Sequence, residues 1–225
     1  MGNNGMQGIR KTTFREIKSS FGRFMAIFAI TALGVGFFAG LKVTKTAMLT
    51  TVREYLNNHG FYDFRLVSTL GFEQENVDTF KNAKDVAAAE GSVSFDILYN
   101  LEDGGQGVVK AFSVTQDMNT LKLVSGRMPL EENECVADSG MLGKSDIGST
   151  IYLSEDNAQE DLEHFTCREY TVVGLVQSPL YLQYERGNTT LGTGRLDGFI
   201  GLLPEGFSTE YYTDIYVKFD RDYGL

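Results

Sequence analysis

The chain has 225 residues, a mean hydropathy of -0.16 and three prolines, with 42% hydrophobic and 22% charged residues. These values exclude collagen-like, coiled-coil, disordered and disulfide-scaffold classes, and they leave no room for several membrane spans. The 30 acidic residues outnumber the 20 basic ones and give a formal charge of -10. This balance argues against nucleic acid as a partner, because a phosphate backbone is bound by a surplus of Lys and Arg.

The first 23 residues form a basic lead. Its charged residues are five basic and one acidic: Arg10, Lys11, Arg15, Lys18, Arg23 and Glu16. Four apolar residues share one face of a helical wheel: Phe14, Ile17, Phe21 and Phe24. This pattern predicts a cytoplasmic amphipathic elbow helix over residues 1–23 that lies in the headgroup plane of a membrane. An unstructured basic tail is the alternative.

Residues 24–41 form an uncharged run of 18 residues, FMAIFAITALGVGFFAGL, between Arg23 and Lys42. At 1.5 Å per residue the run spans about 27 Å as a helix, close to the thickness of the bilayer's hydrocarbon core. It predicts a transmembrane helix, because soluble helices rarely run about five turns without a polar face. A cleaved signal peptide is disfavoured, since the lead is long and Phe37-Phe38-Ala39 places a bulky ring where cleavage needs a small residue.

The flanking charges orient this span. Residues 1–41 carry five basic residues and one acidic residue, net +4, whereas the remainder carries 15 and 29, net -14. The positive-inside rule therefore puts the N-terminus in the cytoplasm and residues 42–225 outside the plasma membrane.

Three small residues, Ala32, Gly36 and Gly40, recur every four residues within the span. Such a stripe permits the close approach of another helix, so it predicts a helix-packing face. Small residues are also common in membrane helices that have no such partner.

Beyond the span, helical spacing of apolar residues continues over 42–60 and ends in Asn57-Asn58-His59-Gly60. A Gly at the C′ position is a helix stop, so this segment predicts a helical stalk. Residues 61–120 then have the pattern of an α+β extracytoplasmic lobe. We expect strands at 61–69, 93–100 and 108–115 and a helix at 73–84.

Residues 121–205 are rich in short strands separated by Gly, Ser, Asn and Asp clusters. They predict an inserted β-rich lobe, barrel-like or sandwich-like, with strands at 134–138, 150–153, 170–177 and 199–203. Residues 206–225 return a strand, at 213–219, to the first lobe. Because that strand would begin a new unit close to the terminus, we expect the chain to be a truncated piece of something longer. The predicted fold class is thus α+β behind a single N-terminal transmembrane helix.

Several segments carry a family resemblance. The lead REIKSSFGR (15–23), followed by ALGVGFFAG in the span, resembles the N-terminus of FtsX-like permeases of ABC transporters. The outer part resembles the MacB-like extracytoplasmic core domain of that family over residues 63–69, 126–129, 134–136, 147–151 and 170–176. Residues 178–187 resemble a long-insert subgroup. The order and spacing of these segments carry the resemblance, which covers nearly the whole chain.

The resemblance implies a permease subunit that works with a cytoplasmic ABC ATPase and dimerises with a second copy or a paralogue. ATP hydrolysis in the partner would move the extracytoplasmic domain, for export or extraction of a lipid, lipoprotein or peptide, or for mechanical signalling across the membrane. It also implies three further membrane helices that this chain does not contain. The alternative is a stand-alone membrane-anchored sensor or ligand-binding module. An anchored secreted hydrolase is disfavoured, because no nucleophile, base and metal constellation is evident.

The residues predict no catalytic, cofactor or metal site, and ATP binding is assigned to the partner because no stretch matches a phosphate-binding loop. Gly192-Thr193-Gly194 is interpreted as a Gly-rich turn, since it lacks the context of a dinucleotide fingerprint. His59 and His164 are interpreted as solvated surface residues. Cys135 and Cys167 either form a disulfide, which the exterior of a cell tolerates, or remain lone thiols in or beside strands.

Two polar stretches keep a functional and a structural interpretation open. The acidic run from Glu155 to Glu163 could attract a cationic peptide or lipid substrate, or it is a solvated loop that keeps the domain soluble. The segment 178–196 is a candidate extracytoplasmic contact loop, because long polar and aromatic loops often carry contacts. Its candidate contact residues are Tyr181, Tyr184, Glu185, Arg186 and Arg195.

Overall fold

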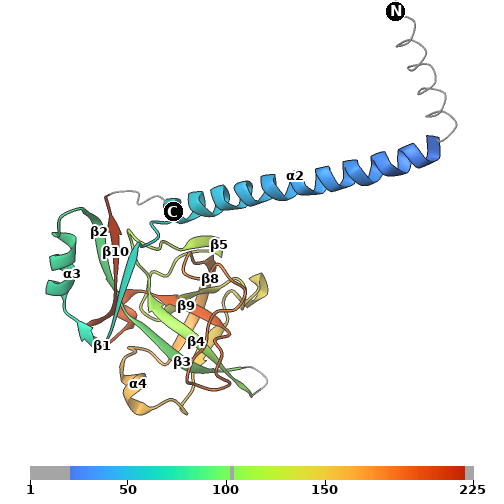
Figure 1. Ribbon diagram of the computed structural model, residues 1–225. Helices are drawn as coiled ribbons and strands as arrows, with labels where there is room; N and C mark the ends of the chain where they lie inside the picture. Colours follow the sequence, from blue (N-terminus) through green and yellow to red (C-terminus); the bar gives the residue numbers. More distant parts are fainter. Residues whose placement is uncertain (1–20, 102–103, 221–225) are drawn as a thin grey trace, which may run out of the picture. The chain divides into compact units, whose positions relative to one another are not determined.

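The structure, a computed structural model, describes residues 21–101 and 104–220 (Figure 1). The chain forms two compact units, Met1–Glu54 and Tyr55–Leu225. Most of the expected elbow helix, residues 1–20, lies outside the described residues. The fold class is α+β behind one N-terminal apolar helix, as predicted.

Helix α2, Phe21–Asn58, is an unbroken helix of 38 residues that contains the expected span, 24–41, and the expected stalk up to Asn58. Among the described residues it is the one helix that is long and apolar enough to cross a membrane. Its threonine hydroxyls donate to carbonyl oxygens one turn earlier, for example Thr31 Oγ1 to Ile27 O at 2.8 Å and Thr44 Oγ1 to Gly40 O at 2.9 Å. The Thr31 hydroxyl, inside the apolar run, thus needs no partner outside the helix, which suits an apolar environment.

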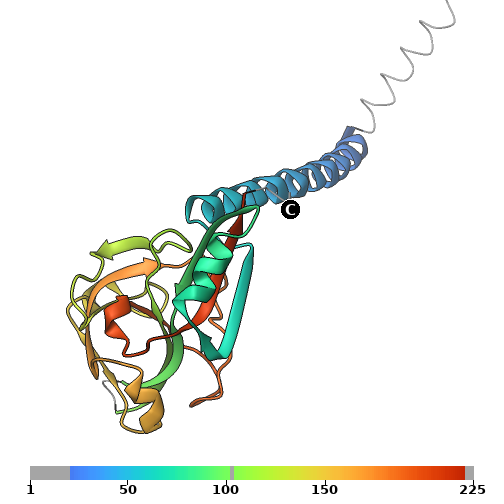
Figure 2. The same cartoon turned by 90° about the vertical axis from the view of Figure 1, so that its left-hand side faces the viewer.

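Three strands and one helix form the first part of the second unit. The sheet has the order β1-β10-β2 and is antiparallel throughout, so the last strand lies between the first two. Helix α3 lies over β2 and β10 (Figure 2), and its Val77 packs with Ala89, Ile215 and Val217 in a small core. The bounds are β1 Phe64–Phe72, α3 Gln74–Lys81, β2 Val86–Ser92 and β10 Tyr212–Phe219.

The other seven strands form the second sheet, in the order β5-β8-β6-β9-β4-β3-β7. Strand β7 also pairs with β8, so all of these strands except β5 close into a small barrel, and β5 extends the edge of β8. The bounds are β3 Ser94–Asn100, β4 Gln106–Ser113, β5 Lys122–Gly126, β6 Glu134–Asp138, β7 Thr150–Leu153, β8 Glu169–Gln177 and β9 Gly198–Leu202.

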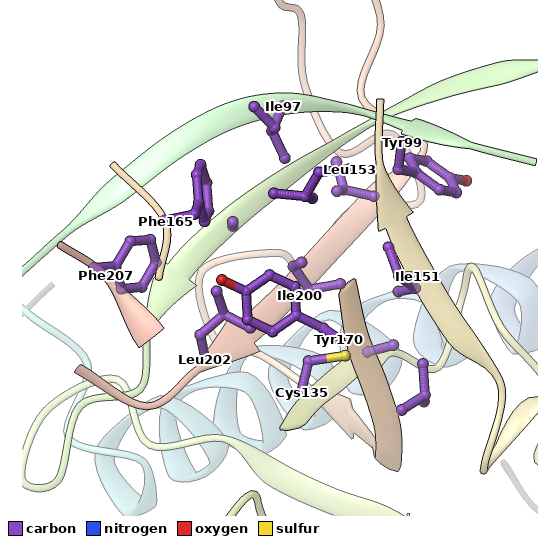
Figure 3. Packing of buried hydrophobic residues seen from close by; sticks show 14 of the residues in the cluster. Ile97, Tyr99, Cys135, Ile151, Leu153, Phe165, Tyr170, Ile200, Leu202 and Phe207 are labelled. Atoms are coloured by element: carbon purple, nitrogen blue, oxygen red, sulfur yellow. The ribbon is translucent and has the colours of Figure 1, made fainter. Parts of the chain in front are cut away.

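Apolar side chains fill the barrel. Figure 3 shows Tyr170, Cys135, Ile200 and Ile151 clustered in this interior, and all four are at most 5% exposed. The Tyr170 hydroxyl donates to the carbonyl oxygen of Gly206 at 3.1 Å, which satisfies the one polar atom that this ring buries. The barrel therefore has a packed interior and is not a ligand cavity.

The structure assigns the hairpin β3–β4 to the barrel, whereas we expected it in the first lobe. Strand β2 runs to Ser92 and β3 starts at Ser94, so the chain passes from one sheet to the other with only Val93 between them. The backbone makes no turn at this crossing. The position of β4 between β3 and β9 explains its burial on both faces, which the expected half-buried hairpin would not show. The change of sheet thus falls near residue 93 and not near 121.

Strands β2 and β5 and helix α4 were not predicted. Strand β2, VAAAEGS, is rich in residues of low strand propensity, and its pairing with β10 comes from the distant end of the chain. Helix α4, Gln159–Glu163, lies inside the acidic run and buries Leu162 in the barrel core. That one apolar contact fixes a short helix in a stretch that otherwise has the composition of a loop.

Candidate functional site

The end of α2 and the residues that follow it, 56–62, are held by hydrogen bonds within the second unit. This stretch is called here the joint. The carbonyl oxygen of Leu56 accepts the N–H of Phe61 at 2.9 Å, and Gly60 has a left-handed φ of +61°, which is the Gly-terminated stop that the sequence predicts. A Cβ at Gly60 would lie 2.5 Å from the carbonyl oxygen of Asp117. Glycine is thus required here both for the backbone angle and for the close approach of another segment.

That other segment is the connection between β4 and β5, residues 114–121, called here the β4–β5 segment. Thr120 donates its N–H to the carbonyl oxygen of His59 at 2.9 Å, and Asn119 donates its N–H to that of Gly60 at 3.1 Å. His59 Nδ1 lies 2.7 Å from the carbonyl oxygen of Thr120, and because a carbonyl only accepts, Nδ1 is the donor. Four residues after the helix, Tyr62 donates its N–H to Asn119 Oδ1 at 3.3 Å.

On its other side the β4–β5 segment is bound by Glu90 of β2. The Glu90 carboxylate accepts three consecutive backbone N–H groups, from Gln116 at 2.7 Å, Asp117 at 3.1 Å and Met118 at 2.9 Å. Consecutive N–H groups that converge on one anion form a backbone nest, and charge-assisted bonds of this type are stronger than neutral ones. One short segment is therefore held by the helix end and by the three-stranded sheet at once.

A buried polar cluster fastens the two sheets to each other. Asp214 of β10 is fully buried, and its carboxylate accepts from Arg65 Nε at 2.7 Å, Ser94 Oγ at 2.8 Å and Thr213 Oγ1 at 2.7 Å. These donors come from β1, β3 and β10, so the cluster bridges the three-stranded sheet and the barrel. A buried carboxylate with this many donors is well compensated.

The candidate contact loop divides into anchored and free residues. Arg186 forms a bidentate pair with the buried Asp138, with Nε to Oδ2 at 2.5 Å and Nη2 to Oδ1 at 3.0 Å. The Tyr181 ring stacks on Phe199 with centroids 4.9 Å apart, and burial raises the pKa of its hydroxyl. Both side chains therefore anchor the loop through their contacts with buried residues. Tyr184, in contrast, is 94% exposed.

Glu185 and Arg195 are also exposed, so with Tyr184 they are the candidate residues still available for contacts. A hollow of about 490 Å³ adjoins the loop, lined by Tyr184, Tyr181 and Leu182 and also by Tyr55 from the last turn of α2. The structure thus brings the contact loop and the helix end to the same hollow. Sequence reasoning had no signal for this proximity.

Both histidines are half-buried, and the expectation of solvated surface residues is wrong for each. His59 belongs to the joint, as described above. His164 stacks on Phe95 with centroids 4.3 Å apart and nearly parallel planes. Each ring is partly buried because it contacts a residue far away in the sequence.

The small-residue stripe lies on α2. Ala32, Gly36 and Gly40 are exposed on α2, and a Cβ at either glycine would meet nothing within 4 Å in the described part of the chain. Their packing role stays a prediction.

Cys135 and Cys167 are free thiols, so the disulfide interpretation is wrong. Burial raises the pKa of the Cys135 thiol.

The described ranges 21–101 and 104–220 contain no group of three His, Cys, Asp or Glu residues that could hold a metal ion. Gly192 and Gly194 both have positive φ, at +49° and +82°, in the Gly-rich turn that the sequence predicts. Within the acidic run, Glu155, Glu160 and Glu163 are exposed, and Asp156 accepts a hydrogen bond from Gln106 Nε2 at 2.6 Å.

Four of the segments that carry the family resemblance lie on adjacent strands of the second sheet: residues 126–129, 134–136, 147–151 and 170–176. A Cβ on Gly126 would collide with the carbonyl of Val173, and a Cβ on Gly174 would collide with that of Arg127, so the backbones of β5 and β8 touch. Arg127 also pairs with Glu134 at the start of β6. These motif residues shape adjacent strands, and their role in the structure is packing.

No protein-family model and no curated protein sequence matches this chain. Two solved structures illustrate what its fold is similar to. The extracellular domain of the noncanonic ABC-type transporter YknZ from Gram-positive bacteria matches with a TM-score of 0.44 and 12% identity, over 68% of this chain and 76% of that one. The periplasmic region of MacB from Actinobacillus actinomycetemcomitans matches with a TM-score of 0.41 and 12% identity, over 71% and 68%.

Proposed function

We propose that this chain is the N-terminal part of a permease subunit of the FtsX/MacB-like class of ABC transporters, in which α2 moves the extracytoplasmic domain. One observation supports this most: the apolar span and the joint belong to the same unbroken helix, Phe21–Asn58. From Lys42 to Asn58 this helix continues for about 25 Å beyond the span. A continuous helix can carry a displacement from the membrane to the joint, whereas a flexible linker would absorb it.

The proposal assigns ATP hydrolysis to a separate cytoplasmic ABC ATPase and makes this chain non-enzymatic. A second permease copy or a paralogue would complete the transporter, and Ala32, Gly36 and Gly40 are the face that we assign to helix packing in the bilayer. The basic lead places the N-terminus in the cytoplasm, and residues 42–225, with a net charge of -14, lie outside. The negative charge of this outer part favours a cationic peptide or lipid as the molecule that is exported or extracted.

External protease treatment of intact cells tests the topology. The proposal expects cleavage within residues 42–225, while an epitope on the N-terminus is degraded only after the cells are permeabilised. A cytoplasmic protein that stays intact shows that the cells are closed. Protection of the domain in intact cells, with demonstrably active protease, would refute the orientation.

Purification in mild detergent tests the partner. Full-length protein should carry an ATPase subunit with it, and Gly60→Ala should retain that subunit, because the substitution lies in the joint and far from the cytoplasmic lead in sequence. Absence of any ATPase from purifications of the native protein would count against the permease proposal.

A second candidate function is a membrane-anchored sensor or ligand-binding module. The nearly fully exposed Tyr184 beside the hollow favours it, because exposed tyrosines are efficient contact residues. Tyr184→Ala should then abolish ligand binding without any dependence on an ATPase. The two functions are separated by whether an ATPase co-purifies.

A further inference from the structure

The helix end has two routes into the second unit. The covalent route leads from Asn58 into β1 and is reinforced by β10: Asp63 donates its N–H to the carbonyl oxygen of Val217 at 2.9 Å, and Phe219 donates its N–H to Asp63 Oδ2 at 2.8 Å. By this route α2 is tied to the three-stranded sheet alone. The barrel would follow only through contacts between the two sheets.

The second route leads directly into the barrel. The β4–β5 segment starts where β4 leaves the barrel and ends at β5, which pairs with the barrel strand β8, and its residues Asn119 and Thr120 bind Gly60 and His59. Glu90 binds the three residues just before them, 116–118, from the other sheet. Helix end, barrel and three-stranded sheet therefore meet on one short stretch of backbone.

We propose that the β4–β5 segment is a coupling element that makes the barrel and the three-stranded sheet follow the end of α2 together, with Glu90 as its positioning residue. This deepens the proposed function, on which its biological meaning rests. The element links α2 to the sheet to which it is not covalently joined.

The conformation of the segment supports a coupling role. Asn119 has a left-handed φ of +49° and is 2% exposed, and Met118 beside it is 1% exposed. Asparagine adopts this conformation at lower cost than most other non-glycine residues, and here the Glu90 nest directly precedes it and the helix end binds its backbone N–H. Release of either side should therefore loosen the whole segment and not only the bonds that were removed.

Glu90 can be changed without damage to a core. Its side chain is half-buried, and it belongs to none of the apolar clusters of either sheet. Glu90→Gln keeps the shape of the side chain and removes the charge. Glu75→Gln on α3 is the matched control, because it removes the same charge from an exposed side chain.

Residue-resolved hydrogen exchange on the full chain in detergent micelles tests the proposal in both directions. Glu90→Gln should raise the exchange rates of the Asn119 and Thr120 amides, which Glu90 does not bind, about tenfold, the same factor as at residues 116–118. Conversely, His59→Ala should raise exchange at 116–118. Reciprocal effects are what a coupled element requires.

Increases confined to 116–118 in Glu90→Gln, or to 119–120 in His59→Ala, would overturn the proposal, as would an equal effect of Glu75→Gln. If Glu90→Gln fails to fold, the His59→Ala arm decides alone, and unchanged exchange at 116–118 then overturns it. Because exchange in micelles depends neither on membrane orientation nor on an ATPase, failure here leaves the proposed function standing, and failure of the protease or purification test leaves this result standing.

Discussion

Replacement of Gly60 by alanine is the sharpest perturbation of the joint. Its φ of +61° is left-handed, and alanine in that conformation costs about 1 to 2 kcal/mol. The new Cβ would also lie 2.5 Å from the carbonyl oxygen of Asp117 and 3.3 Å from the Cα of Met118, so the β4–β5 segment has to move. Movement lengthens the bond from Asn119 N to Gly60 O, now 3.1 Å, and loss of such a bond costs about 1 kcal/mol more.

We therefore expect Gly60→Ala to lower the free energy of unfolding of the domain by about 2 to 3 kcal/mol, measured by urea denaturation. Gly194→Ala is the matched control: its φ is +82°, and the nearest atom to a Cβ there is 3.8 Å away. Gly194→Ala should lower the free energy of unfolding only by the cost of a left-handed alanine, about 1 to 2 kcal/mol. Equal destabilisation by the two substitutions would mean that the contact with the β4–β5 segment contributes nothing, and the account of the joint would be refuted.

Three further outcomes follow from the structure. Arg186→Ala leaves the 2% exposed Asp138 carboxylate without its cation, so urea denaturation should show a loss of about 3 to 5 kcal/mol, and a loss below about 1 would show that the pair is not an anchor. Burial raises the pKa of Tyr170 to about 12, and the unfolded chain therefore releases this proton first as pH rises above the ordinary value of 10. Domain stability should fall between pH 10 and 12, less steeply in Tyr170→Phe; identical pH profiles would contradict the assignment. Leu70 is 94% exposed on the outer edge of β1, so Leu70→Lys should reduce self-association in light scattering at unchanged stability, and unaltered association would exclude that edge.

The features that sequence predicts best are those with a local physical signal. The uncharged run 24–41 and the stop at Gly60 are each decided by a few neighbouring residues, through hydropathy in one case and a left-handed glycine in the other. The β-rich character of the inserted lobe is indicated by short strand-like segments separated by clusters of turn residues. Each of these signals can be evaluated without knowledge of what lies elsewhere in the chain.

The arrangement of strands has no such signal. Strand β10 pairs with β1 and β2 across more than a hundred residues, and the crossing from β2 to β3 at Val93 is marked by no turn. Strand β2 takes its state from these long-range pairs and not from its Ala-rich composition. The lobe boundary was misplaced for this reason.

The candidate site shows the same division. Tyr181 and Arg186 were singled out as contact residues by composition, but their partners Phe199 and Asp138 are distant in sequence and turn both into anchors. Glu90 was missed entirely. A lone carboxylate in the run Ala-Ala-Ala-Glu-Gly is the one available hint, and it does not reveal which backbone groups the carboxylate binds.

The central claim, that α2 carries movement from an ATPase to the outer domain, is tested most directly by a label at the helix end. A cysteine introduced at Tyr55, in a Cys167→Ser background where the remaining native thiol of Cys135 is fully buried, reports on the half-buried last turn of α2 within native membranes. In permeabilised cells that contain the partner ATPase, addition of ATP should change the maleimide labelling rate of Tyr55→Cys and leave that of a control cysteine at the exposed Glu155 unchanged. A rate at residue 55 that is the same with and without ATP, while the ATPase is active, would contradict the account.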